Sequence, residues 1–122
     1  MAVPILKHGA YLIASIQSAL SDVEVLKLRD EITERVGATR ARGVIVDVAG
    51  MDVIDSFVAR SLQTIALTAR LRGAETVIVG IRPDVAVAMV QFDMNLEPLR
   101  TALDLEEGLA LLDQSIGDVN GR

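Results

Sequence analysis

Short apolar runs alternate along the chain with longer segments in which apolar residues recur every three or four positions. The two kinds of segment predict strands and amphipathic helices respectively. The runs 43–48 and 76–81 are hydrophobic almost throughout, which is typical of strands buried on both faces of a parallel sheet. Five strands are predicted in all, at residues 3–6, 10–16, 43–48, 76–81 and 99–102.

The first two predicted strands are separated by residues 7–10, which predict a tight hairpin turn that contains His8. A helix should follow at Ser21, because Ser21 and Glu24 match a capping box, in which each side chain accepts a hydrogen bond from the other residue's backbone. Gly37 predicts the end of that helix. Its apolar face consists of Val25, Leu28, Ile32 and Val36.

Three further helices are predicted, at residues 56–71, at residues 83–92 and from residue 104 onward. Gly73 closes the first of these, and Pro83 opens the second in the position that proline favours. We expect residues 117–122 to form a polar, frayed tail. The predicted core faces are Val58, Leu62, Ile65 and Ala69 in one helix, and Leu105, Leu109, Leu112 and Ile116 in the last.

Together these elements follow the order ββαβαβαβα, with no linker and no internal repeat. Strands that alternate with helices predict an α/β fold, in which a mixed but largely parallel central sheet is flanked by about four helices. The 122 residues are enough for one hydrophobic core. We therefore expect a single domain that spans residues 1–122.

Composition narrows the possible functions. Hydrophobic residues make up 51% of the chain and aromatic residues only 2%, so the core must be aliphatic, and few aromatic platforms exist on which bases could stack. The net charge is −5, and no basic stripe suited to a nucleic-acid duplex is visible. The chain has no cysteine, no visible signal peptide and no apolar stretch long enough to span a membrane. These features predict a cytoplasmic protein that binds neither nucleic acid nor membrane.

Residue types that support catalysis are scarce. His8 is the single histidine, so a metal site made of histidine and cysteine cannot be assembled. The context of Ser56 is not a nucleophile elbow, and no phosphate-binding glycine motif is present. Asp47, Asp52 and Asp55 leave open a site made only of carboxylates, although loop solubility and helix capping also explain them. We expect no enzyme activity, no metal and no cofactor.

Ser56 lies where a helix is predicted to begin, and it has two interpretations. A serine at the N-cap accepts hydrogen bonds from backbone N–H groups and serves only the fold. The same place also favours an anion, and a phosphoryl group would add about −1.5 to −2 charges at pH 7. Next to Asp52 and Asp55, that charge would change a binding surface without unfolding the helix.

The run Asp-Val-Ala-Gly-Met-Asp-Val-Ile-Asp-Ser at residues 47–56 resembles the signature of STAS domains, the anti-sigma-factor antagonist family. The order of the elements is similar along essentially the whole chain. In that family an acidic residue closes a strand, and the serine or threonine that follows an aspartate at the helix start is phosphorylated. The resemblance implies that Ser56 is the acceptor and that Asp47, Asp52 and Asp55 shape its loop.

Within the family, the chain is most similar to scaffold proteins of the stressosome. Three features indicate this resemblance: Phe57-Val58 after the serine, the sequence of residues 76–83, and the lack of the N-terminal sensory domain that the sensor paralogues carry. The resemblance implies that such proteins assemble with sensor paralogues and sequester a serine/threonine switch kinase. Phosphorylation of the scaffold releases the kinase, and a phosphatase then resets the scaffold serine. Phe57 sets the chain apart from antagonists that act alone. Two alternatives stay open, namely a stand-alone antagonist that binds an anti-sigma factor and a module that binds a small ligand such as a nucleotide.

The predicted first strand favours self-association. Residues 3–6 are apolar and should lie at the edge of the sheet, where Pro4 limits uncontrolled pairing. We therefore expect a homodimer through this region, which a charge at Leu6 would disrupt, and a larger hetero-oligomer with the sensor paralogues.

Overall fold

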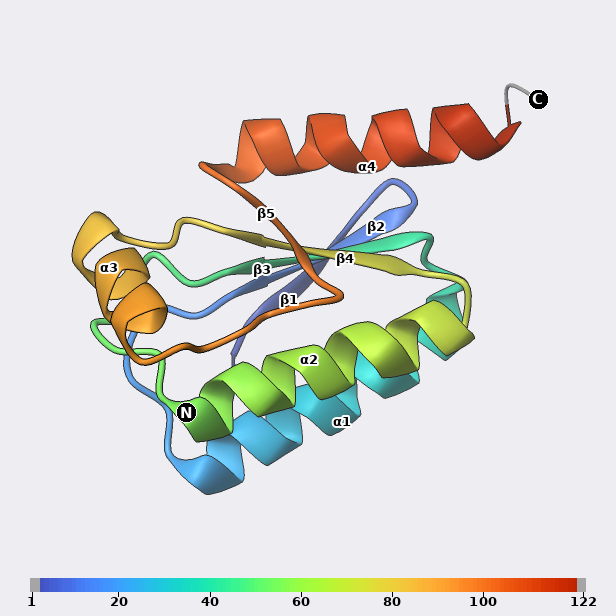
Figure 1. Cartoon of the computed structure of the whole chain (residues 1–122). Coiled ribbons are helices and arrows are strands. Elements are labelled where there is room, and N and C mark those ends of the chain that lie inside the picture. The colour runs from blue at the N-terminus through green and yellow to red at the C-terminus, as the bar shows by residue number, and fades with distance from the viewer. Residues whose placement is uncertain (1–2, 121–122) are drawn as a thin grey trace.

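The computed structural model describes residues 3–120, and its elements follow the predicted order (Figure 1). The strands are β1 (Ile5–His8), β2 (Tyr11–Ser15), β3 (Gly43–Asp47), β4 (Glu75–Val79) and β5 (Arg100–Ala102). The helices are α1 (Asp22–Thr39), α2 (Ser56–Leu71), α3 (Pro83–Gln91) and α4 (Leu105–Asn120).

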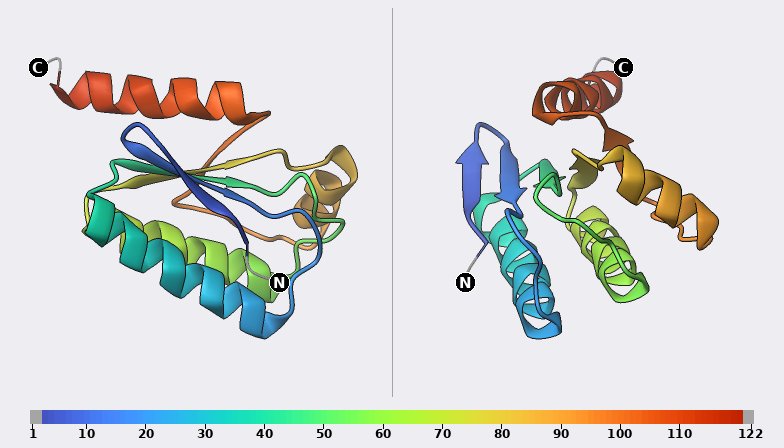
Figure 2. Two further views of the ribbon diagram at one scale, coloured as in Figure 1. Left: turned by 180° about the vertical axis from the view of Figure 1, so that it is seen from behind. Right: turned by 90° about the vertical axis from the view of Figure 1, so that its left-hand side faces the viewer.

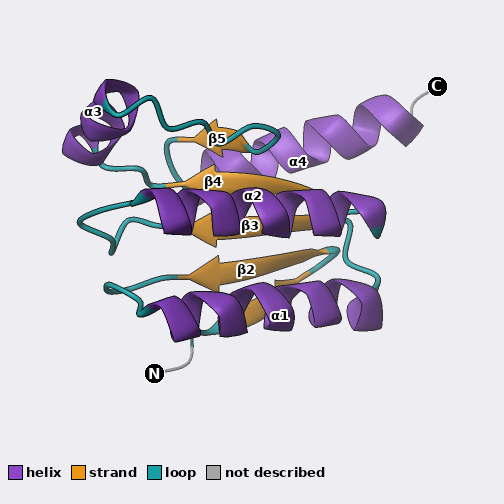
Figure 3. Cartoon of the chain, turned by 60° about the horizontal axis from the view of Figure 1, so that its bottom comes forward, coloured by secondary structure: helices purple, strands orange, loops and turns teal. Residues whose placement is uncertain are grey.

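The strands form one sheet in the order β1-β2-β3-β4-β5, and Figure 3 shows β2 to β5 side by side. β1 pairs with β2 in the antiparallel sense, and every later pair is parallel, so the predicted mixed, largely parallel sheet is confirmed. Because β2, β3 and β4 run in the same direction, their carboxyl ends share one edge of the sheet. The loops that lead into α1, α2 and α3 all leave from that edge.

Helices cover the two faces of the sheet unequally. α1 and α2 lie on one face and α4 on the other, while α3 lies beside the carboxyl edge (Figures 1 and 2). The larger core, between the sheet and α1 and α2, buries all the residues predicted for the faces of these two helices. No helix within residues 3–120 is long and apolar enough to cross a membrane.

The first hairpin is tighter than predicted. β1 continues through His8, which pairs with Tyr11, and only Gly9 and Ala10 form the turn. Gly9 has a φ of +60°, and such positive angles let a two-residue turn follow the right-handed twist of its strands. His8 therefore closes a strand instead of lying within the turn.

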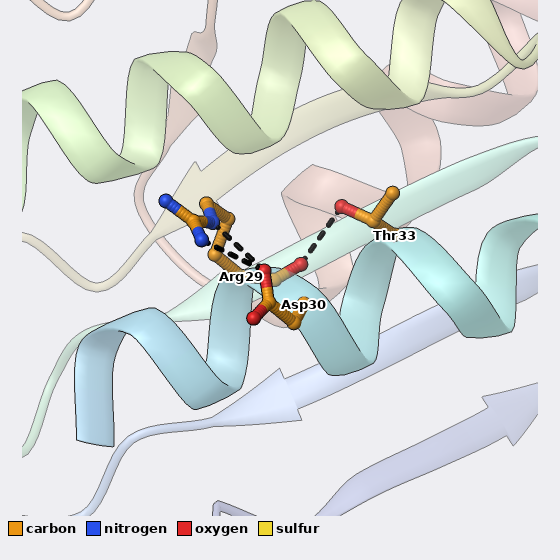
Figure 4. Close-up of polar contacts among 3 residues, drawn as sticks. All are labelled: Arg29, Asp30 and Thr33. Atoms are coloured by element: carbon orange, nitrogen blue, oxygen red, sulfur yellow. Dashed lines mark hydrogen bonds and ion pairs between the residues drawn. The ribbon is translucent and has the colours of Figure 1, made fainter. Parts of the chain in front are cut away.

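The prediction that α1 ends at Gly37 was wrong, because the helix continues to Thr39 and Arg40 closes it in a left-handed conformation. Gly37 lies inside α1 instead, next to the side chain of Arg72. Arg29, Thr33 and Gly37 are four residues apart on one face of α1, and Figure 4 shows Arg29 and Thr33 pointing toward α2. A Cβ atom at Gly37 would lie 2.1 Å from the Nη2 atom of Arg72, just beyond α2.

The prediction for α4 was confirmed only in part. Leu112 is buried and Leu109 is half-buried, but Leu105 is exposed, because α4 alone covers its face of the sheet. The helix continues to Asn120, so the prediction that a frayed tail begins at residue 117 was also wrong. The side chain of Ile116 and residues 121–122 lie outside the described part of the chain.

Tyr11 joins β2 to α4 and supplies a spectroscopic test of this packing. Its hydroxyl donates a hydrogen bond to Asp113, and burial, together with that bond, raises the pKa of Tyr11 from 10.0 to about 12. Since the folded protein holds this proton more tightly, the resulting stabilisation is complete below pH 10 and is lost as the pH rises from 10 toward 12.

Because Tyr11 is the only tyrosine and the chain has no tryptophan, phenolate absorbance reports on this residue alone. We expect the folded protein to titrate toward pH 12 and the urea-unfolded chain to titrate near pH 10. The variant Asp113→Ala should lower the midpoint of the folded protein without bringing it to 10, since the burial remains. Equal midpoints for the folded and unfolded chains would contradict the buried position of Tyr11.

Candidate functional site

Ser56 is the first helical residue of α2, and Asp55 is the residue that caps it. The backbone of Asp55 is extended, and its carboxylate accepts a hydrogen bond from the Val58 N–H group at 2.8 Å. The interpretation of Ser56 as an N-cap was therefore wrong. Aspartate and serine cap helices about equally well, and the backbone conformation at residue 55 decides between the two neighbours.

The Ser56 side chain is consequently available for chemistry. It is exposed, and within residues 3–120 its hydroxyl makes no hydrogen bond. The first turn of α2 directs its N–H groups toward this end of the helix, where they favour negative charge. A hydroxyl in this position can accept a phosphoryl group without breaking a bond that the fold needs.

Asp47 shapes the loop that precedes Ser56. It closes β3 half-buried, and its Oδ1 atom accepts a hydrogen bond from the Ala49 N–H group at 2.9 Å. Gly80, at the end of β4, packs against this turn with a φ of +81°, and a Cβ atom there would lie 2.9 Å from that oxygen. Gly80 was not predicted to contribute to this loop, although a glycine directly after an apolar run signals such a contact.

Asp52 forms an ion pair with Arg82, the residue that precedes α3. The Nε atom of Arg82 also lies 3.8 Å from a carboxylate oxygen of Asp84. Because its carboxylate is engaged in this way, Asp52 does not complete a carboxylate site with the other two. Among the side chains that the structure describes, no group of three or more acidic or histidine residues is placed to hold a metal ion.

A cavity of about 310 Å³ lies between the loop before α2 and helix α3. Its apolar lining includes Val53, which is 68% exposed, and Phe92, which is 72% exposed. Three carboxylates also line it, so the surface beside Ser56 is both apolar and acidic. They belong to Asp52, Asp55 and Asp84.

Two further residues considered from the sequence, Phe57 and His8, are not part of the acidic loop. Phe57 is half-buried and packs against the larger core, so only part of its ring is available to a partner. His8 lies at the opposite edge of the sheet, where β2 begins. A strand of five residues, about 17 Å long, therefore separates it from the edge that holds Ser56, and the two cannot form a catalytic pair.

Comparison with known proteins identifies relatives of this arrangement. The STAS domain family matches residues 2–108. The structure of a Ser→Glu variant of RsbS from Moorella thermoacetica is 32% identical, with a TM-score of 0.80 over 93% of this chain and 97% of that one. A chain from the molecular architecture of the stressosome, a signal integration and transduction hub, is 33% identical, with a TM-score of 0.77 over 93% and 98% of the two chains.

A longer relative matches over part of its length. The RsbT co-antagonist protein RsbRD of Bacillus subtilis (strain 168) is 27% identical over 81 residues, which are 66% of this chain and 29% of that protein. The chain therefore spans less than a third of the length of this relative.

Proposed function

The chain belongs to the STAS domain family, and from that premise we propose that it is a non-catalytic scaffold of a stressosome-type signalling complex, regulated by phosphorylation of Ser56. The unmodified domain holds a serine/threonine switch kinase. Phosphorylation of Ser56 releases the kinase, and a phosphatase restores the binding state.

One observation carries this proposal: the Ser56 hydroxyl is exposed and makes no hydrogen bond within residues 3–120, while Asp55 alone caps α2. A serine that capped the helix would lose a native hydrogen bond on phosphorylation. Ser56 loses none, and the helix end stabilises the added negative charge. The modification can therefore change what binds here while the fold stays intact.

The cavity beside Ser56 supports the choice of docking surface. Exposed Val53 and Phe92 supply apolar contact area, and Asp52, Asp55 and Asp84 supply negative charge. An apolar surface on the kinase would pack against Val53 and Phe92, and a further negative charge at its border would have to lose its hydration when the kinase docks. A phosphoryl group changes the charge at its border by about −1.5 to −2 at pH 7, which alters both the approach and the contacts of a docked partner.

The comparisons support assembly with related domains. The chain is 32% and 33% identical in sequence to the two stressosome-related structures, which favours a scaffold over an antagonist that acts alone. The likeness to RsbRD makes sensor paralogues of the RsbR type the proposed co-assembling partners. A homodimer through β1 is proposed as the smaller unit, since Leu6 on this edge strand is 63% exposed.

Phosphorylation in vitro tests the assignment of the acceptor. The purified protein is incubated with Mg-ATP and the serine/threonine switch kinase of the same genome, and its intact mass is recorded. We expect the wild type to gain one phosphoryl group and Ser56→Ala to gain none. Ser18→Ala, which changes an exposed serine in the loop after β2, should still gain one. Loss of the modification in Ser18→Ala, or its retention in Ser56→Ala, would contradict the assignment.

A further inference from the structure

The end of the molecule opposite Ser56 has a second, chemically different cavity. The carboxyl ends of α1 and α2 and the starts of β3 and β4 meet there, around a hollow of about 500 Å³. Three arginines, Arg40, Arg42 and Arg72, line it together with Gly37 and Gly73. No acidic residue contributes to its lining, although the chain as a whole carries a net charge of −5.

The guanidinium groups of these three arginines make neither a hydrogen bond nor an ion pair with the side chains that the structure describes, although the charge of Arg42 also acts on Tyr11. Arg29 and Arg82, by contrast, are each paired with an aspartate. Positive charges that line one hollow repel one another, and an anion between Arg40 and Arg72 would reduce that repulsion.

Stabilisation of the helix ends explains only part of this concentration of charge. The carboxyl end of a helix carries about half a negative charge, so α1 and α2 together account for about one. Three positive charges exceed that amount, and none of the three side chains donates a hydrogen bond to a carbonyl group at these ends. The charge of the helix ends therefore balances only part of this positive charge.

Backbone features place the cationic groups around the hollow. Arg72 lies across the last turns of α1, where Gly37 leaves room for its guanidinium group. Arg40 has a φ of 54°, a left-handed conformation that turns the chain sharply from α1 toward β3. Gly73 has a φ of +89° and open space around it, so no side chain at this position obstructs the cavity.

We propose that this cavity binds a phosphate-bearing anion. The planar guanidinium groups of arginine match the geometry of phosphate oxygens and bind them through paired hydrogen bonds. The 16 residues of α2 place the cavity about 24 Å from Ser56, so it is a separate site. Two sources supply the same chemistry, a free phosphate compound and a phosphoserine on a second chain.

Calorimetric titration of the full chain at constant ionic strength tests the proposal. The two probes are pyrophosphate and a peptide with the sequence of residues 51–60 that carries phosphoserine at position 56, and the unphosphorylated peptide is the control. We expect saturable binding of at least one phosphate-bearing probe. Arg40→Gln combined with Arg72→Gln should weaken it at least about tenfold, since charge-assisted hydrogen bonds are lost. The matched control Arg100→Gln, at an exposed arginine on β5, should bind like the wild type.

Gly37→Ala supplies a second variant that keeps all the charges. Its methyl group would displace the guanidinium group of Arg72, while alanine favours the helix more than glycine does, so the protein should fold and yet bind the anion more weakly. Tighter binding of the phosphopeptide identifies a second chain as the source, and tighter binding of pyrophosphate identifies a free anion. The proposal is overturned if neither probe binds, or if the double variant binds as tightly as the wild type.

Discussion

Replacement of Ser56 by aspartate is expected to weaken binding of the switch kinase at least about tenfold while leaving the fold unchanged. Ser56 is exposed at the first position of α2, so the new carboxylate meets no steric obstacle. Negative charge at a helix start stabilises the helix by about 0.3–1 kcal/mol, and the free energy of unfolding should stay equal or rise slightly. The loss of binding then arises from charge added beside a surface that Asp52, Asp55 and Asp84 already make acidic.

Two variants separate this explanation from a general effect of mutation. Ser56→Asn has nearly the same size as the aspartate variant without its charge, and we expect it to bind the kinase almost as well as the wild type does. Ser18→Asp adds the same charge to another loop at the same edge of the sheet, and it should have a much smaller effect. Binding is measured by calorimetry and stability by urea unfolding. Equal affinities of the wild type and Ser56→Asp would refute a switch that acts through charge.

Replacement of Gly50 by valine is expected to lower the free energy of unfolding by about 3 kcal/mol. Gly50 lies in the loop between β3 and α2, where its Cα atom packs against the backbone of Gln17 in the loop after β2. A Cβ atom there would lie 2.5 Å from both the carbonyl carbon and the carbonyl oxygen of Gln17. Since these are backbone atoms, no side-chain rotation can relieve the overlap, and the two loops must separate.

Urea unfolding of Gly50→Val and of the neighbouring variant Ala49→Val measures this effect. Ala49 is exposed, so the larger side chain should extend into solvent there and change the stability by less than about 0.5 kcal/mol. Similar losses in the two variants would show that the loops do not pack as described. Because the loop of Gly50 leads to Ser56, Gly50→Val should also slow phosphorylation.

The N-caps of α1 and α2 differ in how far the local sequence determines them. The capping box of Ser21 and Glu24 was predicted and is confirmed by both of its hydrogen bonds, because all its atoms lie within one turn of helix. At α2, Asp55 and Ser56 are adjacent and both suited to capping. The choice of Asp55 depends on the path of the whole loop from β3, which the sequence pattern does not specify.

The errors at the helix ends have a similar cause. A glycine near the end of a helical pattern usually marks its last turn, and Gly37 was interpreted in that way. In the structure Gly37 lies within α1 beside the side chain of Arg72, which follows a different helix 35 positions later in the chain. Contacts between elements far apart in sequence decide such positions, and periodicity carries no information about them.

The sequence by itself determined the order of strands and helices, the aliphatic core and the acidic loop that ends at Ser56. The reason is that the buried positions of a strand or a helix recur at a fixed spacing, which is visible directly as the spacing of apolar residues. Only the tertiary structure decided that Asp52 pairs with Arg82 and that three arginines converge at the far end of α1 and α2. Parallel strands bring the loops of successive units to a common edge, so these groups become neighbours through the topology of the sheet and not through their spacing in the chain.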